Sequence, residues 1–87
     1  MSDANAIERL TILRAFVAAQ DRIAGIAAAI SDAATDTEAM DRVGALLNCN
    51  PTAARAVCSM SILRLASRES RANLNDELEA LERHLSP

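Results

Sequence analysis

The stretch PTAARAVCSMSILRLASRE, from Pro51 to Glu69, decides the fold of this chain. Asn50 followed by Pro51 is the pattern of a helix N-cap with proline at the first helical position, so we expect a helix from Pro51 to Leu65. Apolar residues nearly surround this helix, which indicates contacts on two of its faces. The set that we expect to be buried is Ala54, Val57, Cys58, Ser61 or Ile62, and Leu65, with Met60 and Leu63 in flanking positions.

The composition favours an all-α fold. The chain has 87 residues, 51% of them apolar, and its only aromatic residue is Phe16. Much of the apolar content is Ala and Leu, which are strong helix formers. A single domain of this size, spanning 1–87, buries about 60 to 65% of its unfolded surface and gains stability from oligomerisation.

Two apolar stripes flank the central stretch. The first has the spacing 4-3-4-3-4 and predicts a helix from Ala6 to Ile30; it consists of Ile12, Phe16, Ala19, Ile23, Ile26 and Ile30. The second predicts a helix from Arg68 to Leu85 and consists of Leu74, Leu78, Leu81 and Leu85. Two such stripes indicate an antiparallel pair of long helices. Gly25, inside the first stripe, indicates the close approach of a neighbouring element.

A short helix is predicted between the first stripe and the central stretch. Thr35 and Glu38 have the spacing of a capping box, so the helix begins there and ends near Asn48. Its inner face consists of Met40, Val43, Leu46 and Leu47. We therefore expect four helices, long, short, medium and long, that form a truncated antiparallel coiled coil with a small helical knob.

The sequence of the central helix also matches a known family motif. The family has a helix of the form QAQAIL-x-M-x-L-x-x-L and a turn that ends in Glu. The matching positions are Ala53, Ala54, Arg55, Ala56, Val57, Met60, Ile62, Leu65 and Glu69. Further matches precede the motif at Arg9, Ile12, Leu13, Phe16, Ala19, Asp21, Ile23, Ile26 and Ile30, and follow it in the helix Asp76-Glu77-Leu78-Glu79-Ala80-Leu81.

By these motifs, residues 7 to 85 resemble the coiled-coil and exit-gate segment of the A subunit of bacterial type IIA topoisomerases, DNA gyrase and topoisomerase IV. The chain departs from the family pattern at Ser59, where the family has Asp, and at Arg68, where it has Leu. The resemblance therefore implies a diverged, stand-alone relative. In the family, two copies of this segment meet at their tips and close the lower DNA gate.

These topoisomerases cut DNA with a tyrosine, and the chain contains no Tyr. The resemblance therefore implies a role in protein association and not in DNA cleavage. It implies a homodimer, with the topoisomerase A subunit as a further candidate partner. The expected dimer interface consists of Ala53, Ala56, Val57, Met60, Leu63 and Arg64. Two other functional interpretations stay open, a small helical enzyme of the chorismate-mutase type and an isolated fragment of a DNA topoisomerase.

The titratable and nucleophilic residues do not predict an enzyme or a cofactor site. His84, the single His, is expected to be solvated. The serines near the central helix lack a His base and are expected to cap helices or to bond to their own backbone. Cys49 and Cys58 lack metal-site spacing, so free thiols are favoured, although a disulfide between two chains stays open.

The charge and the hydropathy of the sequence restrict the cellular environment and the kinds of partner that we expect for this chain. Nine Arg against twelve Asp and Glu give a formal charge of −3, which argues against nucleic-acid binding by the chain on its own. Arg64, Arg68 and Arg71 would nevertheless share a stripe on a continuous helix and are candidate phosphate contacts. The charged N-terminal region does not fit a signal peptide, and no apolar run fits a membrane span. We expect a cytoplasmic protein without membrane contact.

Overall fold

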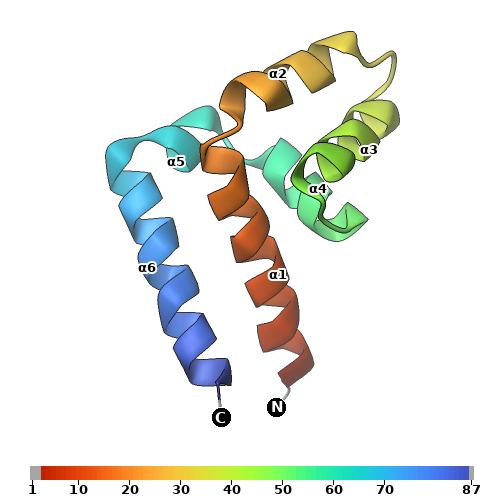
Figure 1. The fold of residues 1–87 in the computed structure, drawn as a ribbon. Coiled ribbons are helices and arrows are strands. Elements are labelled where there is room, and N and C mark those ends of the chain that lie inside the picture. The colour runs from red at the N-terminus through yellow and green to blue at the C-terminus, as the bar shows by residue number, and fades with distance from the viewer. Residues whose placement is uncertain (1–2, 87) are drawn as a thin grey trace.

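The computed structural model describes residues 3–86 and is helical, with no strand in that range (Figure 1). Its helices are α1 (Asp3–Gln20), α2 (Ile23–Asp32), α3 (Asp36–Leu47), α4 (Pro51–Ser59), α5 (Ile62–Ala66) and α6 (Arg68–Leu85). The all-α prediction is confirmed. The described chain has six helices rather than the predicted four, because both the helix from Ala6 to Ile30 and the helix from Pro51 to Leu65 are interrupted.

Helices α1 and α6 lie side by side and run in opposite directions, so both chain ends are at the same end of the molecule (Figure 1). Phe16 of α1 is buried in the core. The α6 stripe contributes the buried Leu74 and the partly buried Leu78 and Leu81. Two ion pairs also join the helices, Arg9 to Glu77 at 2.7 Å and Arg14 to Glu82 at 3.3 Å. Because these side chains are about half exposed, apolar burial contributes more to the packing than the ion pairs do.

Helix α1 ends at Gln20, where a side chain from α6 holds its last turn. Arg71 donates from Nη1 to the carbonyl oxygen of Gln20 (3.2 Å) and from Nη2 to Oδ1 of Asp21 (3.0 Å). A guanidinium at a helix C-terminus satisfies free carbonyl groups and complements the helix dipole. Arg22 has φ −127° and ψ 24°, and α2 begins at Ile23. The interruption lets α2 turn away from α1 and pack on α3 (Figure 1).

The caps that the sequence predicted for α3 and α4 are confirmed. The Glu38 backbone N–H donates to Oγ1 of Thr35 (3.1 Å), and the Glu38 carboxylate accepts from the Ala34 backbone N–H (3.1 Å). The Ala53 backbone N–H donates to Oδ1 of Asn50 (2.8 Å). These bonds satisfy free N–H groups in the first turns, so both helices begin where predicted.

Helices α2, α3 and α4 share one core with the α1–α6 pair. Leu13 of α1 and Val43 of α3 are both fully buried, with an exposed fraction of 0%. A side-chain carbon at Gly25 of α2 would lie 3.3 Å from Cδ2 of Leu46 in α3. The predicted close approach at this glycine is therefore confirmed, and α3 is the neighbour.

A second interruption separates α4 from α5. Met60 is extended, with φ −84° and ψ 140°, and Oγ of Ser61 accepts a hydrogen bond from the Arg64 backbone N–H (3.2 Å). Ser61 therefore starts a new helix of five residues. The prediction that Ser61 or Ile62 is buried is wrong, because both are exposed, and the side chain of Ile62 has an exposed fraction of 68%.

Candidate functional site

The structure divides the expected dimer interface into core and surface residues. Helix α4 packs on α1 and α3, and its Ala53 and Val57 have exposed fractions of 0% and 3%. Ala56 and Met60 are partly buried, whereas Leu63 is 73% exposed. Arg64 is exposed as well. In this conformation only the α5 part of the expected interface is open to a second chain.

An apolar groove of about 150 Å³ lies between α2 and the α4–α5 segment. Its walls include Ile23, Ile26, Ile30, Val57, Met60 and Leu65. Ile30 is 41% exposed, so the groove is open to solvent. The sequence predicted that Ile23, Ile26 and Ile30 lie on a stripe that faces one partner helix, and the turn at Asp21 and Arg22 instead brings them to this groove. We call this cavity the apolar groove.

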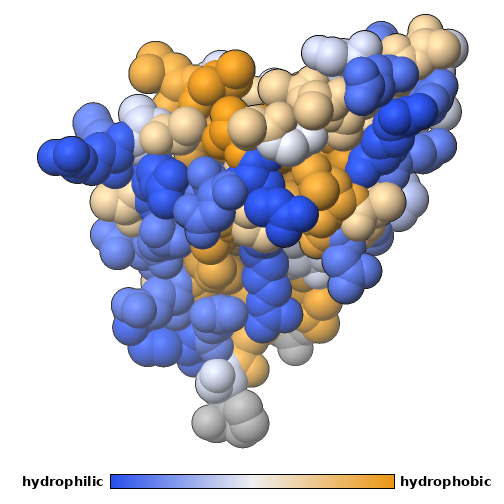
Figure 2. Space-filling view, turned by 45° about the horizontal axis from the view of Figure 1, so that its top comes forward, coloured by the Kyte–Doolittle hydropathy of each residue, from blue (hydrophilic) through white to orange (hydrophobic). Residues whose placement is uncertain are grey.

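Helix α5 contributes one exposed hydrophobic residue to the wall of the apolar groove and carries a second one next to it in the sequence. Ile62 lines the groove and Leu63 follows it in the sequence; both are more than two-thirds exposed. Figure 2 shows hydrophobic residues at the surface at the α5 end of the molecule, beside the paler, alanine-rich surface of α2. Exposed apolar residues that adjoin an apolar groove are typical of a protein interaction site. Ser61 caps α5 and so starts a new helix, which exposes the two residues that follow it. A serine at this position was the signal in the sequence that could have predicted the exposure.

The three candidate phosphate-binding arginines do not form a stripe. Arg64 belongs to α5 and Arg68 begins α6, and Ser67 is extended between the two helices. Arg71 contacts the end of α1 through Gln20 and Asp21. Only Arg64 and Arg68 are therefore available to an external ligand from this set.

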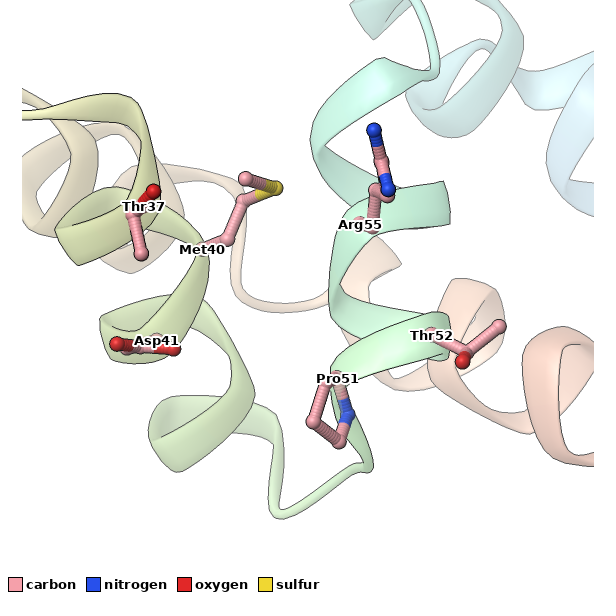
Figure 3. A pocket seen from close by; sticks show the side chains of 6 residues that line it. All are labelled: Thr37, Met40, Asp41, Pro51, Thr52 and Arg55. Carbon is pink, nitrogen blue, oxygen red and sulfur yellow. The ribbon is translucent and has the colours of Figure 1, made fainter.

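A hollow of about 270 Å³ between α3 and α4 does not assemble a reactive site (Figure 3). Its charged residues are Asp41 and Arg55. In Figure 3 Thr52 points away from α3, so its hydroxyl does not face Asp41 across the hollow. A hydroxyl and a carboxylate that do not face each other cannot hold one substrate atom between them.

The remaining candidates for chemistry have structural roles or lie in solvent. Ser61 and Ser67 cap α5 and α6, and Oγ of Ser59 donates to its own helix, as predicted. His84 is exposed. Within residues 3–86, no group of His, Cys, Asp and Glu side chains is arranged to hold a metal ion. These positions do not combine a nucleophile with a base.

The two cysteines are free and partly buried. Burial raises the pKa of the Cys49 thiol, and burial together with the nearby Cys49 raises the pKa of Cys58. A thiol with a raised pKa is a poor nucleophile near neutral pH because the thiolate is scarce. Both cysteines also pack against the hydrophobic core, which is the role of a small apolar side chain.

The described core does not contain the buried charges that a chorismate-mutase-type site would need to grip carboxylates. Gln20 is the buried polar residue of the part of the chain that the structure describes. Its Nε2 atom has no hydrogen-bond partner there, while its backbone carbonyl accepts from Arg71. This arrangement fixes the end of α1.

None of the helices within residues 3–86 combines the length and the apolar character needed to cross a bilayer. Comparisons of the chain with protein-family models, with curated proteins and with solved structures gave no match.

Proposed function

We propose that the chain is a non-catalytic interaction module that forms a homodimer through α5 and the adjoining apolar groove. The observation that carries this proposal is the exposure of Ile62 and Leu63, at 68% and 73%, on a helix of five residues. Burying two such side chains contributes about 1.5 to 3 kcal/mol each. A second copy of the chain offers the same surface, which suits a two-fold dimer.

The proposal includes a diverged relationship to the exit-gate segment of topoisomerase A subunits. The sequence motifs support it, as does the pairing of α1 with α6, which we interpret as a truncated antiparallel coiled coil that carries the knob. On the same resemblance, the second proposed partner is the topoisomerase A subunit. The chain would act by binding a second copy of itself or the A subunit, since it has no Tyr to cut DNA.

The dimer is tested by sedimentation equilibrium of the wild type and of Leu63→Asp. We expect a dimer for the wild type and a monomer for the variant, because a carboxylate would have to be desolvated in the interface. Ile7→Asp is the matched control: Ile7 is 54% exposed but lies near the start of α1, away from α5 (Figure 1). A monomeric wild type, or a Leu63→Asp variant that remains dimeric, would refute the proposal.

The topoisomerase partner needs its own experiment. The purified chain is mixed with a gyrase preparation, and co-elution and the supercoiling rate are measured. We expect co-elution with the A subunit and a changed supercoiling rate, both weakened by Leu63→Asp and preserved by Ile7→Asp. If the two proteins do not co-elute and the supercoiling rate is unchanged on mixing, the topoisomerase partner is refuted and the homodimer proposal is unaffected.

A further inference from the structure

The apolar groove continues beyond α2 to the start of α3. A second hollow, of about 290 Å³, shares Ile30 and Cys58 with the groove and adds Met40 and Asp36 to its walls. The combined surface therefore runs from Ile62 in α5, past Ile30, to the first turn of α3. Its middle is apolar, and its chemistry differs at the two ends.

The two ends of this combined surface carry opposite charges. Asp32 at the end of α2 and Asp36 at the start of α3 are exposed at one end. Arg64 is exposed in α5, two residues after Ile62, and Arg68 is exposed at the start of α6. None of these four side chains takes part in the five ion pairs found within residues 3–86. Each is free to form an ion pair with a partner.

A surface with an apolar middle and opposite charges at its ends complements its own copy. A two-fold rotation about an axis through the middle exchanges the ends and brings each basic end opposite an acidic one. We propose that Leu63 of each chain inserts into the apolar groove of the other, with Arg64 facing Asp36 of the partner subunit. This inference rests on the proposed homodimer and specifies its surface and its charge pairing.

A second copy fits this surface better than other occupants do. The acidic end would repel a nucleic acid, and the apolar middle offers no donor to a phosphate. A purely acidic or purely basic peptide would meet its own charge at one of the two ends. Only a partner with both charges in the reverse order satisfies both ends, and the chain supplies that order itself.

Charge reversal tests the pairing. Dimer dissociation constants are measured at low ionic strength for the wild type, Arg64→Glu, Asp36→Arg and the double variant. Each single reversal replaces two attractions per dimer by two repulsions, so we expect about tenfold weaker dimerisation. The double variant should return to within about threefold of the wild type, because it restores opposite charges at both contacts. High salt should reduce these differences.

Arg83→Glu is the matched control for the change in net charge. Arg83 lies near the C-terminal end of α6, where it pairs with Glu79, and its reversal should change the dissociation constant by less than about twofold. Circular dichroism melts of all variants separate folding from pairing. Asp36→Arg places a cation at a helix N-terminus, and the double variant retains that cation, so rescue by the double variant cannot come from improved folding.

The outcomes distinguish this inference from the proposed function. If the wild type is a dimer that Leu63→Asp disrupts, but the double variant binds no better than the single reversals, the charge pairing is overturned and the dimer stands. Unchanged dissociation constants in both single variants would overturn it equally. A wild type that stays monomeric would overturn both proposals.

Discussion

Replacing Arg71 should destabilise the protein more than replacing another arginine of the same helix. Arg71 donates to the Gln20 carbonyl, which belongs to a residue that is only 5% exposed, and to the carboxylate of Asp21. We assign about 1 kcal/mol to the first bond and, since the side chains of Arg71 and Asp21 are 40% and 78% exposed, about 0.5 kcal/mol to the second. Arg71→Ala should therefore cost about 1.5 kcal/mol.

Arg83→Ala is the reference for this comparison. Arg83 pairs with Glu79 on the same helix, and both side chains are 71% exposed, so its loss should cost about 0.3 kcal/mol. Arg71→Lys keeps the positive charge but not the bidentate hydrogen bonding of the guanidinium. We expect it to lower the free energy of unfolding by about half as much as Arg71→Ala does. In melting temperature, a loss of 1.5 kcal/mol corresponds to about 6 to 12 °C for a domain of this size.

The assay is urea denaturation followed by circular dichroism, at one fixed protein concentration because dimerisation would make stability depend on concentration. The free energies of unfolding of the variants are compared at equal slope. Equal losses for Arg71→Ala and Arg83→Ala would refute the conclusion that Arg71 stabilises the end of α1. If Arg71→Lys lowers the free energy of unfolding as much as Arg71→Ala does, the stabilisation by Arg71 comes from its bidentate hydrogen bonds alone and not from its charge.

Three further predictions concern the core, the pH dependence and the thiols. Leu13→Ala should lower the free energy of unfolding by about 3 kcal/mol, because Leu13 is fully buried; urea denaturation that shows less than about 1 kcal/mol would contradict its place in the core. The hydrogen bond from the Ala34 N–H, and after it the ion pair with Arg42 of α3 (2.6 Å), lowers the pKa of Glu38 below its usual 4.5. The stability that the Glu38 carboxylate contributes is therefore complete above pH 4.5 and is lost as the pH falls through the lowered pKa. The difference in unfolding free energy between the wild type and Glu38→Gln should thus be constant from pH 7 to 5 and shrink at lower pH, and a difference that grows there would oppose this. Cys49 and Cys58 should react with iodoacetamide at pH 8 several times more slowly in the folded protein than in urea, because burial raises both pKa values; equal rates would contradict their packing.

Signals local to a few residues predicted the helix starts correctly. Thr35 with Glu38 and Asn50 with Pro51 place an accepting side-chain oxygen within one turn of the backbone N–H that donates to it, and such hydrogen bonds occur in the structure, from Glu38 to Thr35 and from Ala53 to Asn50. Such caps depend on neighbouring residues alone, so the sequence contains the whole interaction.

The interruption at Asp21 could not be predicted from local sequence. The apolar spacing continues unchanged from Phe16 to Ile26, and a continuous helix is the simplest interpretation of that spacing. The stabilising contact comes from Arg71, which is 51 residues away from Gln20 in the chain. Tertiary contacts of this kind override local helix propensity.

The interruption after Ser59 changed the candidate site more than any other difference. A continuous helix would have placed Ile62 on a buried face and aligned Arg64 with Arg71. Ser61 is a good N-cap residue, and its position before an apolar run was a signal that the helical spacing concealed. The candidate interface therefore lies on α5 and the apolar groove and not, as predicted, on the side of α4.

The most direct test of the central claim, that the chain assembles through α5 and the apolar groove, is a dilution series of methyl NMR spectra of the wild-type protein. We predict that the methyl signals of Ile30, Ile62 and Leu63 shift with protein concentration along one binding curve. The methyl signal of Ile7, which is exposed near the start of α1, should stay fixed and serves as the internal control. Spectra that do not depend on concentration, or shifts confined to Ile7 and the α6 leucines, would contradict the claim.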